Sequence, residues 1–185
     1  MLHNALEDFR VQLPLADVVI LSDYGKGGLT HIAEMIRLAR AASKPVLVDP
    51  KGDDYARYRG ATLLTPNRSE FREVAGSWKT EAEFSTKAEK LRSELQLDAL
   101  LVTRSEDGMS LYRADEVLHE PTPTREVFDV SGAGDTVIAT LAVMLASGAD
   151  LPEAMRIANR AAGIVVGKLG TAVVSRDEIV RDMQG

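Results

Sequence analysis

The chain has 185 residues, of which 45% are hydrophobic, so it is long enough for one domain with a sizeable core. Its formal net charge of -6 argues against a broad basic surface, and we expect neither nucleic acid nor a membrane as a partner. The absence of cysteine excludes disulfides and thiolate zinc sites. Since the start is not leader-like and no segment has the apolar length to span a bilayer, we expect a soluble, cytoplasmic protein.

Four short apolar runs predict buried strands. They follow a short helical lead-in and are continuous rather than alternating in polarity, which is typical of strands covered on both faces. The runs lie at 17–23, 45–50, 61–67 and 99–105. We expect the first to be a central strand, because a doubly wound sheet has strands on both sides of such an element.

Helical patterns separate and follow these runs. Segments 30–43 and 80–96 carry apolar residues near helical spacing, which predicts two amphipathic helices. Residues 109–122 indicate a hairpin with its turn near Ala114 and Asp115, and two long helices are expected from about Gly132 and Pro152. The alternation predicts one α/β domain with a mostly parallel sheet and flanking helices.

Polar residues follow each predicted strand, at the sheet edge where ligands of open parallel sheets collect. They are Asp23, Tyr24, Lys26, Asp49, Lys51, Asn67, Glu70, Thr103, Arg104 and Ser105. Glycines beside Lys26 would let the backbone approach a ligand, although Lys26 and Lys51 taken alone are more typical of solvated loop lysines. Asn67 and Glu70 have the spacing of a helix capping box, which is the structural alternative to a ligand role.

The segment "DVSGAGD", residues 129–135, precedes an apolar helical run. If a helix begins near Gly132, its first N–H groups have no intrahelical partners and can bind phosphate oxygens. Asp135 would then lie in the first turn, where its carboxylate could take a proton from an alcohol that attacks a phosphoryl group. The alternative is a glycine-rich turn in which Asp135 only favours the helix N-terminus, by about 0.3–1 kcal/mol.

Two nucleotide-binding motifs are excluded for this segment. A Walker-type loop needs lysine and Ser/Thr after its glycines, whereas Asp135 follows here. A dinucleotide fingerprint follows the first strand of a βαβ unit, whereas this segment comes after the predicted hairpin.

"DVSGAGD" resembles the C-terminal signature of the ribokinase-like (PfkB) carbohydrate kinases. The resemblance implies a ribokinase-like, Rossmann-like fold, with Gly132, Ala133 and Gly134 as the anion hole and Asp135 as the catalytic base. "TPNRSE" resembles the NxxE element of that family, which implies that Glu70 acts on Mg²⁺ through water. The cofactor-binding residues that the resemblance implies, together with Lys51, are Asn67, Arg68, Ser69, Glu70, Thr103, Arg104, Ser105, Gly108 and Asn159. The implied cofactors are ATP and Mg²⁺.

Several segments taken in order, from "LSDYGKGGL" to "GIVVGKLGT", are similar to the kinase domain of the heptose 7-phosphate kinases of lipopolysaccharide precursor synthesis. That resemblance implies transfer of the ATP γ-phosphoryl group to the anomeric hydroxyl of D-glycero-β-D-manno-heptose 7-phosphate, giving the 1,7-bisphosphate. Asp23 and Lys26 become candidate contacts of the substrate phosphate. An adenylyltransferase domain, fused or separate, and a homo-oligomer are left open as partners.

The resemblance begins partway through the kinase fold. We therefore expect residues 1–185 to be the C-terminal, nucleotide-binding portion of one kinase domain, without the N-terminal strands and lid that contact the sugar. Ser105 departs from the family, in which many members have glycine at this turn. The alternative functions are another PfkB-type sugar or nucleoside kinase, and a non-catalytic nucleotide-binding fragment.

Overall fold

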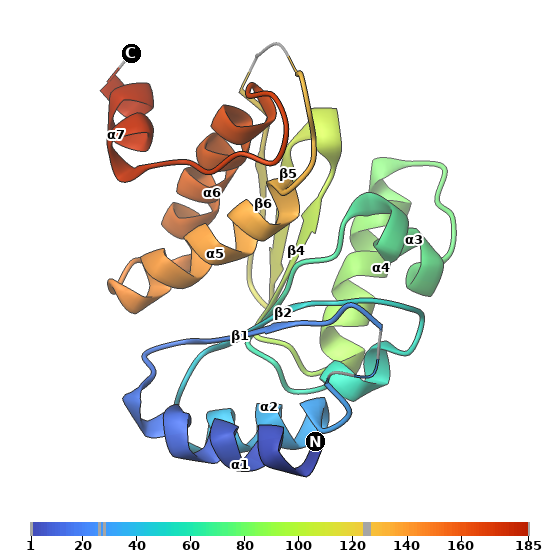
Figure 1. Ribbon diagram of the computed structural model, residues 1–185. Helices are drawn as coiled ribbons and strands as arrows, with labels where there is room; N and C mark the ends of the chain where they lie inside the picture. Colours follow the sequence, from blue (N-terminus) through green and yellow to red (C-terminus); the bar gives the residue numbers. More distant parts are fainter. Residues whose placement is uncertain (1, 26, 28, 124–126, 185) are drawn as a thin grey trace. The chain divides into compact units, whose positions relative to one another are not determined.

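The computed structural model describes residues 2–25, 27, 29–123 and 127–184 (Figure 1). The chain divides into two compact units. The first unit comprises residues 1–102 and 111–117, and the second comprises residues 103–110 and 118–185. Each unit positions its own set of candidate site residues.

Six strands form one sheet in sequence order. They are β1 (Val19–Ser22), β2 (Val46–Asp49), β3 (Leu63–Leu64), β4 (Ala99–Thr103), β5 (Met109–Arg113) and β6 (Val117–Glu120). The pairs β1–β2, β2–β3 and β3–β4 are parallel, with Val19 opposite Val46 and Leu63 opposite Ala99. The short connections 104–108 and 114–116 allow only antiparallel neighbours, as the predicted hairpin requires. The mostly parallel α/β fold is confirmed.

β1 differs from its predicted place. Among the described residues it pairs with β2 alone and is therefore the edge strand of this sheet rather than a central one. The segment before it forms helix α1 (Leu2–Gln12) and a short 3-10 turn, η1 (Leu13–Leu15), which confirms the predicted helical lead-in. Ile20 on β1 is 42% exposed, which is consistent with an edge position.

The core of the first unit lies between the parallel strands and helices α2 (Ile32–Ala41), α3 (Arg68–Ala75) and α4 (Glu81–Glu94). Alternate strand residues such as Val46 and Val48 join the same apolar cluster as Phe71 of α3 and Phe84 of α4. The intervening residues Leu47, Leu63 and Leu101 are also fully buried. Both faces of these strands are covered, as the continuous apolar runs predict.

The second unit is built on helices α5 (Ala133–Ala146) and α6 (Leu151–Val166), which lie side by side (Figure 1). Both begin close to their predicted starts. α6 is capped by Asp150, whose side chain accepts a hydrogen bond from the N–H of Glu153 at 2.8 Å. α7 (Arg176–Gln184) packs on α6, where Arg160 pairs with Asp182 at 3.2 Å. The N–H groups of Phe128 and Asp129 donate to the carbonyl of Val166 at 2.8 and 3.2 Å, which ties the segment before α5 to the end of α6.

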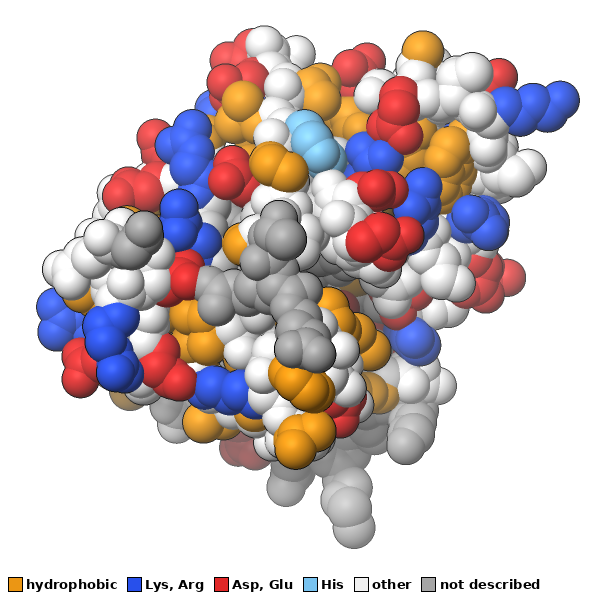
Figure 2. All heavy atoms as spheres, turned by 90° about the horizontal axis from the view of Figure 1, so that it is seen from above, with side chains coloured by type: hydrophobic (Ala, Val, Ile, Leu, Met, Phe, Trp, Pro, Cys, Tyr) orange, Lys and Arg blue, Asp and Glu red, His pale blue; other side chains and the backbone are white. Residues whose placement is uncertain are grey.

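Basic and acidic side chains are interspersed on the face shown in Figure 2, without a broad region of one sign. Within the described part of the chain, the helices fall short of the length and hydropathy that crossing a membrane requires.

Candidate functional site

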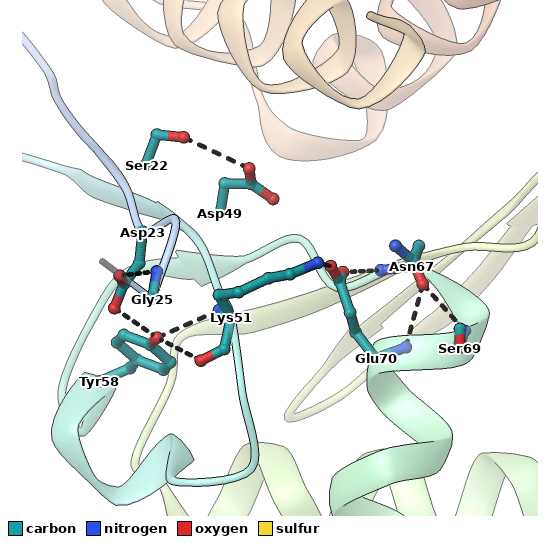
Figure 3. Close-up of polar contacts among 9 residues, drawn as sticks. All are labelled: Ser22, Asp23, Gly25, Asp49, Lys51, Tyr58, Asn67, Ser69 and Glu70. Carbon is teal, nitrogen blue, oxygen red and sulfur yellow. Dashed lines mark hydrogen bonds and ion pairs between the residues drawn. The ribbon is translucent and has the colours of Figure 1, made fainter. Parts of the chain in front are cut away.

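Asp23 lies at the end of β1 and is almost completely buried, with 5% of its surface exposed. Its Oδ2 accepts a hydrogen bond from the Tyr58 hydroxyl at 2.8 Å, and its Oδ1 accepts one from the N–H of Gly25 at 2.8 Å (Figure 3). Arg57 Nη1 lies 3.5 Å from Oδ2. The carboxylate therefore anchors the segment that follows β1, while its contact with a substrate phosphate stays a prediction.

Tyr58 joins the segment after β1 to the segment after β2. It ends the 3-10 turn η2 (Tyr55–Tyr58), and its hydroxyl accepts a hydrogen bond from the N–H of Lys51 at 3.1 Å. Burial raises the pKa of Tyr58 to about 12, so the hydroxyl is neutral and can donate to Asp23 at neutral pH. Tyr58 was not among the predicted site residues. Its signal was an aromatic pair, Tyr55 and Tyr58, inside an otherwise charged stretch.

Lys51, Glu70 and Asn67 form a continuous chain of polar contacts (Figure 3). Lys51 Nζ lies 2.9 Å from Glu70 Oε1, and Glu70 Oε2 accepts the N–H of Asn67 at 2.9 Å. Asn67 Oδ1 in turn accepts the N–H groups of Ser69 and Glu70. The predicted capping box of α3 is confirmed. The ligand roles predicted for these residues are not excluded by it, because the Asn67 amide nitrogen is not part of the cap.

The other candidates of the first unit are placed as follows. Arg68 and Ser69 occupy the first turn of α3. Asp49 ends β2, and its Oδ2 accepts a hydrogen bond from Ser22 Oγ at 3.4 Å. Lys26 lies outside the described residues. The structure thus brings Asp23, Lys51 and Glu70 into one group at the carboxyl ends of β1 to β3.

In the second unit, a tight turn connects β4 to β5. The N–H of Arg104 donates to the carbonyl of Gly108 at 2.7 Å, and Ser105 adopts a left-handed backbone with φ 54°. Gly108 has φ +85°, and a Cβ at this position would collide with the carbonyl of Glu120 and lie 2.7 Å from the nitrogen of Thr122. Gly108 is therefore required by close backbone packing, whatever its role toward a nucleotide.

Two predicted nucleotide contacts are buried and tied to the protein. Arg104, 6% exposed, donates from Nη1 to Ser110 Oγ at 3.2 Å, and that oxygen lies 3.1 Å from His119 Nδ1. Asn159 of α6, 4% exposed, donates from Nδ2 to the carbonyl of Pro121 at 2.7 Å. Ser110 and His119 were missed, because nothing in their local pattern marks them as polar partners. Thr103 is half-buried at the end of β4.

The segment 129–135 forms a turn that leads directly into α5. Gly132 is the N-cap in a left-handed conformation with φ 79°, which explains the glycine there. Asp129 Oδ1 accepts the N–H of Ser131 at 2.8 Å, and this hydrogen bond lowers the pKa of Asp129. Asp135 lies exposed in the first helical turn, and a Cβ at Gly134 would meet open space. N–H groups of a first turn lack intrahelical partners, so this end of α5 can receive an anion beside a carboxylate.

The family assignment rests on the whole chain as well as on this turn. The pfkB family carbohydrate kinase profile matches residues 11–178. The chain belongs to the pfkB family of carbohydrate kinases. It is 59% identical over 168 residues to the D-beta-D-heptose 7-phosphate kinase of Bordetella bronchiseptica, covering 91% of this chain and 54% of that protein. It is 57% identical over 180 residues to the bifunctional protein HldE of Shewanella amazonensis, covering 97% of this chain and 38% of that protein.

Solved structures place this pfkB family chain in the ribokinase fold. The structure of Arabidopsis thaliana ribokinase complexed with ribose and ATP has a TM-score of 0.83 at 23% identity, over 95% of this chain and 58% of that one. Ribokinase from Giardia lamblia has a TM-score of 0.84 at 24% identity, over 100% and 64%. The chain spans about half, or less, of the length of the curated relatives described above.

Proposed function

We propose that this chain carries the nucleotide-binding and proton-accepting part of an ATP-dependent heptose kinase. The reaction is transfer of the γ-phosphoryl group of ATP to the anomeric hydroxyl of D-glycero-β-D-manno-heptose 7-phosphate. The observation that carries the proposal is the 59% identity with a D-beta-D-heptose 7-phosphate kinase over 91% of the chain. The turn that places Asp135 in the first turn of α5, directly after Gly132, supports it.

Asp135 is the base in this proposal. As the anomeric oxygen forms a bond to the γ-phosphorus, the bond from that phosphorus to the bridging oxygen breaks and ADP leaves with the electron pair. The anomeric proton passes to the Asp135 carboxylate, which contributes about 10²–10⁴-fold as a positioned base. An exposed carboxylate suits this step, because it is open to the acceptor.

The anion hole is the N-terminal end of α5. Gly132, Ala133 and Gly134 are assigned to it, at the helix end where the dipole adds positive charge. The N–H of Ala133 donates to the carbonyl of Val130 at 3.2 Å, so it would have to exchange this partner for the anion. Preorganised donors of this kind stabilise the charge that gathers on the transferred group. Gly134 has open space where a side chain would lie, which leaves room for the phosphoryl oxygens.

The residues of the first unit would bind Mg²⁺ only when a nucleotide supplies further ligands. Among the described residues there is no group of three His, Cys, Asp or Glu side chains that could hold a metal ion. Mg²⁺ commonly binds one or two carboxylates, several waters and substrate phosphates, and Glu70 is the carboxylate that we assign to it through water. When bound, the ion would neutralise charge on the phosphates. Asn67, Arg68, Ser69 and Lys51 are proposed as their neighbours.

The remaining site assignments are proposals of the same kind. Thr103, Arg104, Ser105, Gly108 and Asn159 are assigned to the nucleotide, and Asp23 and Lys26 to the substrate phosphate. We also propose that residues 1–185 form the nucleotide-binding portion of one kinase domain that acts in the cytoplasm. An adenylyltransferase, fused or separate, is the proposed protein partner.

A panel of acceptors tests the substrate. The chain is exchanged for the matching 168 residues of the B. bronchiseptica kinase, and phosphate transfer from ATP is measured with heptose 7-phosphate, ribose, fructose 6-phosphate and adenosine. Because the sugar-contacting part of the hybrid comes from the B. bronchiseptica kinase, the unexchanged kinase is the reference for every acceptor. We expect the hybrid to keep the heptose 7-phosphate turnover and the acceptor preference of that reference, because this chain supplies the same nucleotide-binding and proton-accepting groups. A folded hybrid without turnover would contradict the proposal. A preference for any other acceptor would overturn the proposal.

A further inference from the structure

In the ion pair between Lys51 and Glu70, the Glu70 side chain is held in place and the Lys51 side chain is free to move. Both carboxylate oxygens of Glu70 are engaged, Oε1 by Lys51 Nζ at 2.9 Å and Oε2 by the N–H of Asn67 at 2.9 Å. The Glu70 side chain is 12% exposed and is held in the cap of α3, whereas the Lys51 side chain is 54% exposed. Lysine carries its charge on a flexible four-carbon stem, so the ammonium can leave while the carboxylate stays.

Carboxylates from two elements act on the charge of this ammonium. Glu70 raises the pKa of Lys51 most strongly, through its hydrogen bond, and the charges of Asp49 on β2 and Glu73 on α3 add to the effect. Three carboxylates therefore act on one positive charge. The negative charge of these carboxylates favours a cation next to Glu70, and it would favour a divalent ion over a monovalent one.

We propose that the Lys51 ammonium pairs with Glu70 in the nucleotide-free protein and there takes the position that the metal ion's charge would have. When the Mg²⁺–nucleotide complex binds, the ammonium leaves Glu70 and the metal ion replaces it. This inference rests on the proposed function, because Mg²⁺ arrives there with the nucleotide. Lys51 is thus a positioning residue. It keeps Glu70 oriented and neutralised in the free protein.

The exchange predicts competition between Lys51 and the metal ion for one carboxylate. If Lys51 instead stays on Glu70 in the complex, removal of the lysine would loosen Glu70 and weaken metal binding. If Lys51 acts only by repelling the metal over a distance, its removal would strengthen metal binding whether or not Glu70 is charged. A double-mutant cycle separates these cases, because it isolates the part of the Lys51 effect that depends on Glu70.

The test measures Mn²⁺ bound to the protein by electron paramagnetic resonance, with the non-hydrolysable analogue AMP-PNP present at saturation. The variants are Lys51→Met, Glu70→Gln and the double variant, with Lys51→Gln as a second neutral replacement. Glutamine at position 70 still fits a capping box, so the α3 cap is retained. Lys90→Met, on the exposed face of α4, removes the same charge elsewhere as a matched control. Thermal unfolding checks that each variant is folded.

We expect Lys51→Met and Lys51→Gln to tighten Mn²⁺ binding by about three- to five-fold, the size of a partly exposed ion pair. In the Glu70→Gln background the same change should have no effect, and Lys90→Met should match the wild type. Unchanged or weaker Mn²⁺ binding in both Lys51 variants overturns the exchange, and so does tightening that persists in the Glu70→Gln background. If the wild type binds no Mn²⁺–AMP-PNP, the proposed function fails and the inference fails with it.

Discussion

The Tyr58 hydroxyl donates a hydrogen bond to the buried carboxylate of Asp23 at 2.8 Å and accepts one from the N–H of Lys51 at 3.1 Å. One side chain thereby connects the segments that follow β1 and β2. Asp23 lies 35 residues before Tyr58, so this connection is made by the fold rather than by local sequence. It holds Lys51 at the point where its side chain reaches Glu70.

Replacing Tyr58 by phenylalanine removes the hydroxyl and keeps the buried ring. We expect a loss of about 1–3 kcal/mol in the free energy of unfolding, measured by urea denaturation, because a buried carboxylate loses a donor. Tyr55→Phe is the matched control. Its hydroxyl is buried without a hydrogen-bond partner among the described residues, so its removal should be neutral or slightly stabilising. Equal losses in the two variants would contradict this account of Tyr58.

Tyr58→Phe also changes how stability depends on alkaline pH. The pKa of Tyr58 is raised from 10.0 to about 12, chiefly by burial. The unfolded chain therefore loses this proton at lower pH than the folded one, so the stability contribution is present below pH 10 and is lost as the pH rises toward 12. Tyr58→Phe should flatten the fall in stability over that window. A fall as steep as in the wild type would show that Tyr58 does not cause it.

Two substitutions of Asn67 separate its role as the cap of α3 from its proposed role in nucleotide binding. Asn67→Ala should cost about 1 kcal/mol of stability, because two N–H groups lose their acceptor. Asn67→Asp keeps the accepting oxygen and should stay within about 0.5 kcal/mol of the wild type. If Asn67 also contacts the nucleotide, Asn67→Asp should nevertheless weaken ATP binding measured by titration calorimetry. Unaltered ATP binding in Asn67→Asp would show that Asn67 caps α3 and does not contact the nucleotide.

Ser105 adopts a left-handed backbone in the turn after β4, at φ 54°. This geometry accounts for the glycine that many family members are expected to have there, because a Cβ makes the left-handed region costly. Ser105→Gly should stabilise the protein by roughly 0.5–1 kcal/mol, with part of the relief offset by the greater entropy of glycine in the unfolded chain. Ser105→Ala keeps a Cβ and should show no gain. A thermal melt in which Ser105→Gly is the less stable variant would refute the argument.

Local pattern was sufficient for most elements of the fold. The apolar runs predicted β1 to β4, and the spacing around Asn67 and Gly132 predicted where α3 and α5 begin. The helical lead-in was predicted before β1 and forms α1, so the strand expected on the other side of β1 does not come from this segment. Sequence also missed Tyr58, Ser110 and His119, whose polar partners lie at the ends of other elements. Tyr58 is marked only by its aromatic pair with Tyr55, and the contacts of Ser110 and His119 have no local signal.

Some features of the candidate site were likewise predictable from local sequence, and others were not. The turn at Gly132 and the capping box at Asn67 follow from residue types that only a few backbone conformations accommodate. The pairing of Lys51 with Glu70 joins residues 19 positions apart and depends on the parallel register of β2 and β3. The sequence placed both residues at strand ends, but it gave no reason for Lys51 to prefer Glu70 over the nearer Asp49.

The most direct measurement is the effect of Asp135→Asn on ATP affinity and on phosphoryl transfer in the hybrid heptose kinase. Asparagine keeps the size of the side chain and removes its capacity to accept the proton. We expect ATP affinity within about threefold of the unsubstituted hybrid and a kcat lower by about 10²–10⁴-fold. Unchanged turnover, or a loss explained entirely by weaker ATP binding, would contradict the assignment of Asp135 as the base.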